Sequence, residues 1–297
     1  MNYTEWADNI FDKGRLVGES TGYVELDRMV GGIRRNTVTV LVGATGMGKS
    51  MFAINVMVNM ARNGTKVAYL DLENGAEVAG ERFLRIWYKL PKEWFDDAKH
   101  KEQASQMLQE IFDGNISYWS PLALKAVDFF NPDRKMFTDI LTTLCIGNKV
   151  VFVDPLQMLT IKTSQANLLQ EQGAILELLN EITKRHKSAV VLCHHLRKST
   201  TTGGVWVGDT DDVQAPKVRV PTIDDVKGSS MIADHATDVW GFVKTTTGKS
   251  LLRVLKNRNG FQGDIKLQFN NSTLVYDDGL SHEENVGLFL KGNEHGL

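Results

Sequence analysis

The chain has 297 residues, of which 34 are Lys or Arg and 36 are Asp or Glu, so its formal net charge is −2. Hydrophobic residues make up 42% and charged residues 24%, a balance that is typical of folded globular proteins and excludes a disordered chain. No apolar segment approaches the roughly 18 residues that a membrane-spanning helix needs, and residues 1–9 lack the basic start and apolar centre of a signal peptide. We therefore expect a cytoplasmic protein without a membrane partner.

The cysteines and the net charge exclude some classes of site but not others. The two cysteines, Cys145 and Cys193, lie far apart in the sequence, which excludes a zinc cluster or a CxxC redox pair. The near-neutral charge is unlike that of a strongly basic nucleic-acid-binding domain. A ring of subunits can nevertheless concentrate a few basic side chains in its central channel, so composition alone does not exclude DNA binding.

The first part of the chain alternates between predicted strands and helices. Residues 1–17 predict a short arm or helix that precedes a main domain over residues 18–280. Val38–Val42 is a continuous apolar run that ends in glycine-rich sequence, as is typical of a strand buried on both faces of a parallel sheet. A helix over residues 49–63 and a second strand over Val67–Leu72 follow.

The same alternation continues toward the C-terminal end. Further predicted elements are a mostly helical stretch over residues 76–113 that is interrupted near Pro91, a strand at Lys149–Val153, a long amphipathic helix over 166–187 and a strand at Ala189–Cys193. Strand-like segments return at Val239–Val243, Leu251–Leu255 and Ile265–Phe269, before a polar tail over 281–297. The pattern predicts an α/β fold, with a mostly parallel sheet flanked by helices and antiparallel strands at its C-terminal edge.

A phosphate-binding loop follows the first predicted strand. The pattern G-x-x-x-x-G-K-[ST] is matched by Gly43, Ala44, Thr45, Gly46, Met47, Gly48, Lys49 and Ser50, with Met51 next among the candidate nucleotide-binding residues. Glycines let backbone N–H groups turn toward phosphate oxygens, and the helix that follows adds positive potential. Lys49 would contact the β- and γ-phosphates and Ser50 would bind Mg²⁺. The sequence therefore predicts binding of ATP, or of another NTP or dNTP, with Mg²⁺; a chance glycine-rich turn is the alternative.

Acidic residues end two of the predicted strands. Asp154 ends the third strand, where P-loop proteins place an aspartate that holds the magnesium shell; the alternative is an aspartate that only opens the turn at Pro155. Glu73 follows the second strand, at the sheet edge where α/β proteins place their sites. We expect Glu73 to orient or deprotonate water, and Asp71 to be a partly exposed structural residue.

Two histidines, His194 and His195, follow the fourth predicted strand. A histidine at this edge can hydrogen-bond to a γ-phosphate and so report its loss on hydrolysis. The alternative is that both are ordinary polar residues at the end of a strand.

These motifs, taken together, resemble the helicase domain of DnaB-like hexameric replicative helicases. The resemblance covers roughly residues 20–278 in the family's order and rests on residues 20–33, the phosphate-binding loop, Leu72-Glu73, residues 153–157, residues 193–196, residues 226–238 and residues 255–263. The chain has a histidine at a position where bacterial members have glutamine. In this respect it resembles the helicase half of T-odd phage primase-helicases and their mitochondrial relatives. An origin in a phage or an organelle is therefore open.

The resemblance implies a role for each matching residue. Glu73 is implied to be the catalytic carboxylate, and Lys49 to be a further catalytic residue. Asp154 is implied to hold the Mg²⁺ shell. His195 rather than His194 is implied to be the γ-phosphate sensor, because His195-Leu196-Arg197-Lys198 is similar to the family's His-Leu-Lys pattern. Arg258 is implied to be an arginine finger that acts on the neighbouring subunit's nucleotide, with Lys256 as a second basic contact. From the residues alone, Arg258 is a surface arginine on an edge strand.

The resemblance also implies a RecA-like core and an ATP-dependent DNA helicase that works in replication. The implied assembly is a homo-oligomer, a hexameric ring that moves 5′→3′ on single-stranded and forked DNA, with a separate primase, polymerase or loader as further partners. Residues 197–228 would contain the channel loops, with Arg197, Lys198, Lys217, Arg219 and Lys227 as candidate DNA contacts, although a plain solvated loop is the alternative. Other functions that stay open are a RecA/RadA-type recombinase filament and a P-loop scaffold that uses nucleotide only for assembly.

Overall fold

The computed structural model describes residues 18–120, 134–159, 168–196, 206–207, 218–226, 229–244, 249–258 and 260–279. The predicted arm over residues 1–17 and the predicted tail over 281–297 lie outside these residues. The domain boundaries drawn from the sequence therefore stay predictions.

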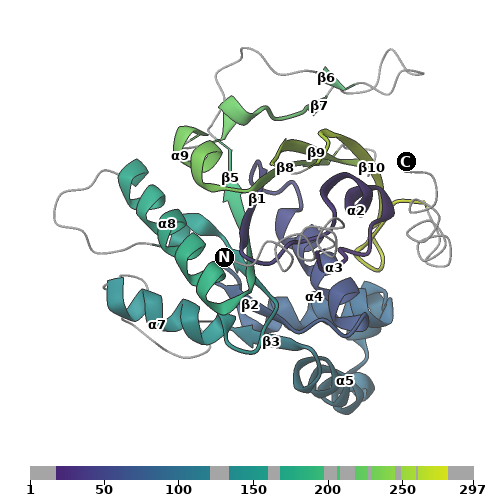
Figure 1. Ribbon diagram of the computed structural model, residues 1–297. Helices are drawn as coiled ribbons and strands as arrows, with labels where there is room; N and C mark the ends of the chain where they lie inside the picture. Colours follow the sequence, from purple (N-terminus) through teal and green to yellow (C-terminus); the bar gives the residue numbers. More distant parts are fainter. Residues whose placement is uncertain are drawn as a thin grey trace, which may run out of the picture.

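A nine-stranded sheet runs through the described part of the chain (Figure 1), in the order β11-β10-β9-β8-β1-β5-β4-β2-β3. Its strands are β1 (Thr37–Gly43), β2 (Val67–Asp71), β3 (Ile116–Trp119), β4 (Val150–Asp154), β5 (Ala189–His195), β8 (Asp238–Lys244), β9 (Lys249–Asn257), β10 (Gly263–Asn270) and β11 (Val275–Asp277). The strands from β8 through β3 in this order are parallel, and β9, β10 and β11 continue the sheet in antiparallel fashion.

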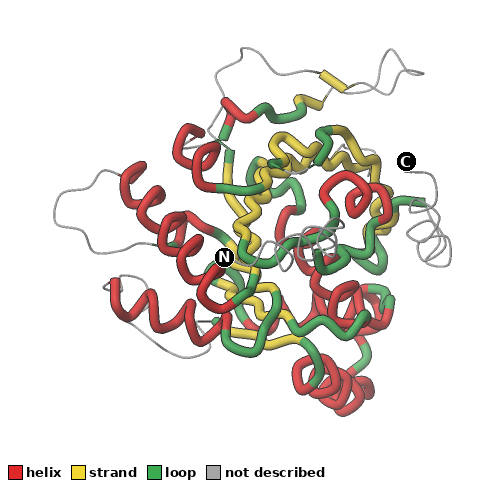
Figure 2. Tube along the Cα trace, viewed as in Figure 1, coloured by secondary structure: helices red, strands yellow, loops and turns green. Residues whose placement is uncertain are grey.

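Helices cover both faces of the sheet (Figure 2). They are α2 (Val24–Val30), α3 (Lys49–Arg62), α4 (Ala76–Tyr88), α5 (Lys101–Asp113), α7 (Arg134–Cys145), α8 (Leu168–His186) and α9 (Ser229–His235). Residues of α2 to α5 pack in one hydrophobic cluster and residues of α7 to α9 in a second. Side chains of β1 alternate between the clusters, with Leu41 in the first and Val40 and Val42 in the second, because successive side chains of a strand point to opposite faces.

The elements predicted between residues 38 and 113 are confirmed, with shifts at their ends. The helical stretch over residues 76–113 is divided into α4 and α5 by two short 3-10 helices, Lys92–Asp96 and Ala98–His100, as the interruption at Pro91 indicated. Elements without a counterpart among the predictions include the edge strand β3, the helix α7 and the short strand β11. A four-residue strand such as β3 has too few positions to show a period.

The C-terminal strands refine one expectation. They are antiparallel to one another as predicted, but β8 also pairs in parallel with β1 and lies inside the sheet. The strand that leads to Arg258, β9, lies between β8 and β10 and is not the outermost strand. The interpretation of Arg258 as a residue on an edge strand is therefore wrong. An apolar run such as Val239–Val243 has no local feature that distinguishes a parallel from an antiparallel neighbour.

Two smaller features complete the described structure. A separate two-stranded sheet pairs β6 (Trp206–Val207) with β7 (Val218–Arg219) in antiparallel fashion. Among the helices that the structure describes, none has the length and apolar character needed to cross a membrane.

Candidate functional site

The carboxyl ends of four neighbouring parallel strands meet at one edge of the sheet. β1 ends at Gly43, which lies opposite His195 on β5. β2 ends at Asp71, which lies opposite Asp154 at the end of β4. Because β4 also pairs with β5, the structure brings these predicted site residues to one edge, where open α/β sheets bind their ligands.

The phosphate-binding loop, residues 43–50, connects β1 to α3 as the sequence predicted. Gly46 and Gly48 have φ angles of 81° and 99°, a backbone region that favours glycine. A Cβ atom at Gly43 would lie 2.7 Å from the carbonyl oxygen of Phe242, so the close packing of β1 against β8 also requires glycine. The loop ends at the first turn of α3, whose N–H groups have no partner within the helix and suit an anion.

The ammonium group of Lys49 lies inside this loop. Its Nζ atom donates hydrogen bonds to the carbonyl oxygens of Gly43 and Ala44, at 2.9 and 3.0 Å. Burial lowers the pKa of Lys49 below its ordinary value, and nearby acidic groups, Asp154 and Glu73 among them, oppose this effect. The carbonyl contacts show that the side chain folds back over the loop, where a bound phosphate would replace them as the partner of the ammonium group.

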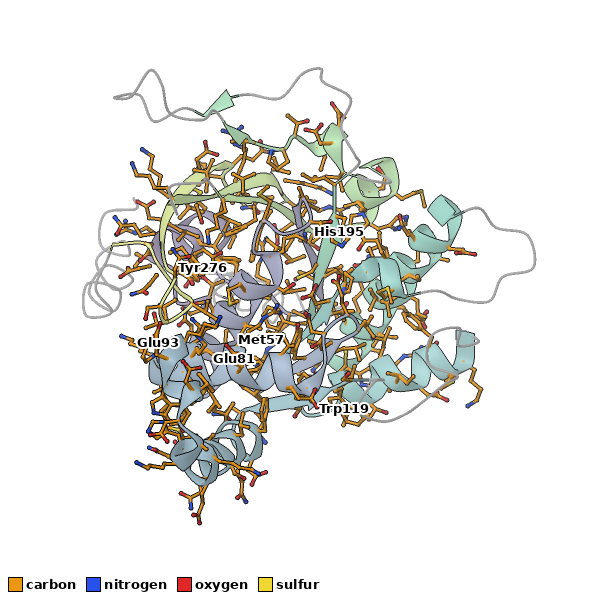
Figure 3. All side chains as sticks on the ribbon, turned by 180° about the vertical axis from the view of Figure 1, so that it is seen from behind. Met57, Glu81, Glu93, Trp119, His195 and Tyr276 are labelled. Atoms are coloured by element: carbon orange, nitrogen blue, oxygen red, sulfur yellow. The ribbon has the colours of Figure 1, made fainter. Side chains whose placement is uncertain are left out.

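His195 contacts the same loop from the end of β5 (Figure 3). Its Nδ1 atom is 3.4 Å from Lys49 Nζ and 3.3 Å from Thr45 Oγ1. His194, in contrast, is fully buried within the strand. The geometry therefore favours His195 over His194 as the histidine next to the phosphate-binding loop.

The Asp154 carboxylate lies beside the hydroxyl group of Ser50. Burial raises the pKa of Asp154, and the largest opposing effect is the hydrogen bond that Ser50 donates, followed by one from Tyr69. The Tyr69 hydroxyl donates to Asp154 Oδ2 at 3.2 Å. A buried carboxylate next to a hydroxyl oxygen is an oxygen donor set of the kind that Mg²⁺ prefers, and a cation there would offset the cost of burying the charge. The residues present therefore fit Mg²⁺.

The two carboxylates at the end of β2 have different surroundings. Asp71 is fully buried, which corrects the expectation of a partly exposed residue. Its Oδ1 atom accepts hydrogen bonds from the backbone N–H groups of Glu73 and Asn74, at 3.2 and 2.9 Å, and its Oδ2 atom accepts one from the Tyr118 hydroxyl at 3.2 Å. Asp71 lies beside Tyr118 of β3, a strand that the sequence did not reveal. It holds the turn from which the exposed Glu73 side chain projects.

The predicted basic residues Lys256 and Arg258 lie at the other end of the strands, near the start of β1 and far from the phosphate-binding loop. Asp238 at the start of β8 pairs with Thr39 on β1 and with Asn257 on β9. Arg258 is therefore beyond the level of Thr39, whereas the phosphate-binding loop begins at Gly43, about 13 Å farther along β1 at ~3.3 Å per residue. An extended arginine side chain does not span that separation.

Both basic side chains rest against the end of α9. Lys256 Nζ donates to the carbonyl oxygen of Ala236 at 2.7 Å, and the Arg258 guanidinium donates to the carbonyl oxygen of Asp234. Burial, together with the nearby Arg258 charge, lowers the pKa of Lys256. The two cations are therefore close together.

The candidate DNA contacts are mostly outside the part of the chain that the structure describes. Arg197, Lys198, Lys217 and Lys227 lie outside it. Arg219 is on β7, where its backbone pairs with Trp206 of β6. The assignment of these residues to DNA stays a prediction.

Comparison with known proteins decides the family. Residues 18–278 match the model of the DnaB-like helicase C terminal domain. The chain belongs to the DnaB-like helicase family. This confirms the family that the sequence motifs resembled, over nearly the same residues.

Curated relatives of this DnaB-like chain are longer proteins. The replicative DNA helicase DnaC of Bacillus subtilis (strain 168) is 23% identical over 272 residues, which cover 86% of this chain and 56% of that protein. The DNA repair and recombination protein RadB of Methanobrevibacter smithii is 27% identical over 175 residues, which cover 57% of this chain and 63% of that protein. The chain thus spans about half the length of the replicative helicase that it matches.

Two solved structures share the fold of this DnaB-like chain. A DnaB-like replicative helicase that was studied with its primase interactions superposes with a TM-score of 0.72 at 17% identity, over 92% of this chain and 65% of that one. A second structure, that of an ATPase domain, gives a TM-score of 0.73 at 17% identity, over 92% of this chain and 95% of that one. The predicted RecA-like core, with a mostly parallel sheet and antiparallel edge strands, is confirmed.

Proposed function

We propose that this DnaB-like chain is an NTP-driven DNA helicase that moves along single-stranded DNA and separates duplex strands during replication. The family match over residues 18–278 carries the proposal. The convergence of a phosphate-binding loop, two acidic residues and a histidine at one sheet edge supports it, because nucleotide hydrolysis needs these groups together.

In this proposal each group at the sheet edge has one task. Lys49 binds the β- and γ-phosphates of ATP, or of another NTP or dNTP, once phosphate oxygens replace the carbonyl oxygens that it now contacts. Glu73 orients and deprotonates the attacking water from its exposed position after β2. His195, which already contacts Lys49 and Thr45, senses the γ-phosphate.

Mg²⁺ belongs to the same proposal. Ser50 and Asp154 would hold it, since their oxygen atoms are neighbours in the structure. When bound, the cation neutralises negative charge on the phosphate groups. Tyr69 keeps Asp154 oriented toward Ser50 through its hydrogen bond.

The position of Arg258 supports a finger that acts on a second subunit. It lies near the start of β1, at the other end of the strands from its own phosphate-binding loop. The nucleotide that it can reach therefore belongs to a neighbour. A guanidinium supplied in trans stabilises charge on the transferring phosphoryl group and makes hydrolysis depend on assembly. Lys256, close to Arg258, would be a second contact, and the assembly would be a hexameric ring.

DNA and partner proteins complete the proposed assembly. Arg197, Lys198, Lys217, Arg219 and Lys227 would contact the phosphate backbone of the strand in the channel. Forked DNA would be the substrate, with 5′→3′ movement. Primase is a candidate partner because a structurally similar DnaB-like helicase was studied with its primase interactions; a polymerase or a loader is another.

Strand displacement on forked duplexes tests this function. A duplex whose loading strand has a 5′ single-stranded tail should be unwound in the presence of ATP and Mg²⁺. A duplex whose loading strand has a 3′ tail should not be unwound. Displacement of neither fork, despite ATP hydrolysis, would contradict the helicase assignment.

One alternative has an observation in its favour. The partial match to RadB points to a recombinase that coats DNA as a filament. Electron microscopy separates the two assignments, because a recombinase forms open filaments on single-stranded DNA and the proposed helicase forms closed rings. A scaffold that uses nucleotide only for assembly would form rings without unwinding either fork.

A further inference from the structure

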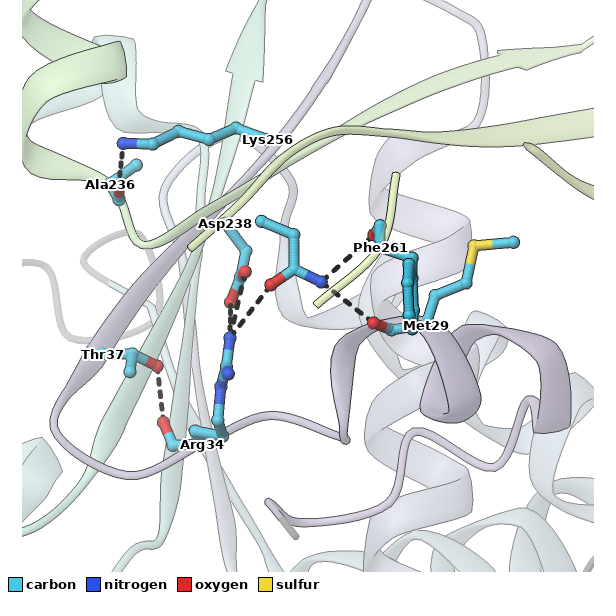
Figure 4. Close-up of polar contacts among 8 residues, drawn as sticks. Met29, Arg34, Thr37, Ala236, Asp238, Lys256 and Phe261 are labelled. Atoms are coloured by element: carbon cyan, nitrogen blue, oxygen red, sulfur yellow. Dashed lines mark hydrogen bonds and ion pairs between the residues drawn. The ribbon is translucent and has the colours of Figure 1, made fainter. Parts of the chain in front are cut away.

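A cluster of polar side chains connects the end of β9 to the start of β8 (Figure 4). The cluster lies at the other end of the strands from the phosphate-binding loop. The Arg34 guanidinium donates to both carboxylate oxygens of Asp238, at 3.2 and 3.3 Å, and to Asn257 Oδ1 at 3.3 Å. The side chains of Arg34 and Asp238 are only 6% and 3% exposed. Because a buried charge persists only when it is paired, the position of this guanidinium is fixed by Asp238.

Arg34 in turn sets the orientation of the Asn257 side chain. A carboxamide has an acceptor oxygen at one end and a donor nitrogen at the other. The oxygen faces the guanidinium, so the nitrogen faces away from it, and Asn257 Nδ2 donates to the carbonyl oxygens of Met29 and Phe261, at 2.9 and 3.2 Å. Met29 is in the last turn of α2. The amide therefore links the end of β9 both to α2 and to the chain that follows Arg258.

The chain bends at Gly260, and the backbone of this bend is held tightly against α2. The N–H group of Phe261 donates to the Met29 carbonyl oxygen at 3.3 Å. A Cβ atom at Gly260 would lie 2.3 Å from that oxygen and 2.5 Å from Asn257 Nδ2, so no other residue fits without displacing the bend. Arg258, in contrast, is exposed. Its guanidinium donates to the carbonyl oxygen of Asp234 in α9. The exposed side chain of Arg258 therefore lies between two points where the backbone is fixed, Asn257 and Gly260.

We propose that Asn257 is a positioning residue for Arg258, which it holds in the direction of the neighbouring subunit's nucleotide by fixing the end of β9, together with Gly260 and Phe261, against α2. The inference rests on the proposed action of Arg258 in trans. A group that stabilises a transition state must be placed accurately, because an error of about 1 Å costs on the order of 100-fold in rate. A loop free to move would not supply such accuracy.

The test compares single and double variants in DNA-stimulated ATP hydrolysis by the full chain. Asn257→Ala should lower kcat roughly 10- to 100-fold, with the KM for ATP and ring assembly close to those of the wild type. The matched control is Asn115→Ala, which removes another half-buried amide that donates to a backbone carbonyl, that of Ala61, at 3.0 Å. The control should keep kcat within about twofold of the wild type.

Variants that already carry Arg258→Ala distinguish a positioning role of Asn257 from a general effect on the structure. Adding Asn257→Ala to Arg258→Ala should cause no further loss of kcat, because the group that Asn257 positions is already absent. Mixed rings of Asn257→Ala and Lys49→Ala subunits should recover hydrolysis, as those of Arg258→Ala and Lys49→Ala should. If Asn257→Ala does not fold, Gly260→Ala takes its place, since its Cβ atom would displace the bend and the Asn257 amide without removing that side chain.

Each contrary result has a distinct meaning. Wild-type kcat in both Asn257→Ala and Gly260→Ala, or a further loss on adding either to Arg258→Ala, would overturn the positioning role while the proposed finger stands. Full activity of Arg258→Ala would overturn the finger itself, and the positioning role with it.

Discussion

The Nδ1 atom of His195 lies 3.4 Å from the Nζ atom of Lys49. The two residues are far apart in the sequence, and they meet because β5 pairs in parallel with β1 and places His195 opposite Gly43. In the proposed function Lys49 binds phosphate, to which a histidine in this position can respond. The contact connects the phosphate-binding loop to β5.

Replacement of Lys49 tests the phosphate-binding loop. Lys49→Ala should abolish hydrolysis, because Lys49 is the cation that the loop encloses. ATP turnover is the measurement, with thermal unfolding as a check on the fold. ATP turnover near the wild-type rate would exclude the assignment of the loop.

Replacement of His195 tests the sensor. His195→Ala should retain nucleotide binding but reduce DNA-stimulated hydrolysis roughly 10- to 100-fold, the equivalent of one hydrogen bond to a charged group. His195→Gln keeps a donor and should retain most of the activity. Equal stimulation by DNA in wild type and His195→Ala would show that the contact has no role in sensing.

The two carboxylates after β2 should differ in their effects. Glu73→Gln keeps the shape but removes the charge, so nucleotide should bind while turnover falls by about 100-fold or more. Asp71→Asn retains an oxygen that can accept the backbone hydrogen bonds of the turn and should be milder. If Asp71→Asn is the damaging change and Glu73→Gln is silent, the catalytic carboxylate is wrongly assigned.

Mixed rings test whether Arg258 acts across a subunit boundary. Arg258→Ala and Lys49→Ala should each lose nearly all hydrolysis alone, with a small residual kcat in Arg258→Ala, but about a quarter of the interfaces in a random equal mixture combine an intact Lys49 with an intact Arg258. Hydrolysis should therefore reappear on mixing. Wild-type activity per subunit should also rise with protein concentration, because the site is complete only after assembly. Full activity at high dilution, without rescue on mixing, would make Arg258 structural.

Asp27 should make stability depend on pH. Burial raises the pKa of Asp27 from 3.8 to about 6, against the hydrogen bonds that Ser20 and Thr21 donate. Between these two values the folded chain binds more protons than the unfolded chain, so stability falls as the pH rises. The contribution is complete below about pH 4 and is lost as the pH rises through about 6, a difference of roughly 3 kcal/mol.

Urea unfolding at several pH values measures this effect. The free energy of unfolding of the wild type, relative to Asp27→Asn, should decrease between about pH 4 and pH 6 and level off above it. Asparagine does not titrate and keeps an acceptor for the same donors, so it is the matched reference. A constant difference across this range would show that Asp27 titrates normally in the folded chain.

The phosphate-binding loop and the residues at the strand ends were predictable from the sequence. A local pattern identified residues 43–50, because the glycines and the lysine of a phosphate-binding loop lie within one short segment. Asp154, Glu73 and the pair His194-His195 were expected together because apolar runs mark parallel strands, and the carboxyl ends of such strands meet at one edge. These inferences needed only short segments and one rule of sheet architecture, whereas the choice of His195 within the pair came from the resemblance to the family.

Other features depend on which strands become neighbours, which only the tertiary structure decided. The hydrogen bond from Tyr118 to Asp71 depends on the pairing of β3 with β2. The distance of Arg258 from its own phosphate-binding loop depends on the pairing of β8 with β1 and β9. The contact between Asn257 and Arg34 joins residues that are 223 positions apart. Strand order and register arise from packing across the whole sheet, and no local periodicity contains them.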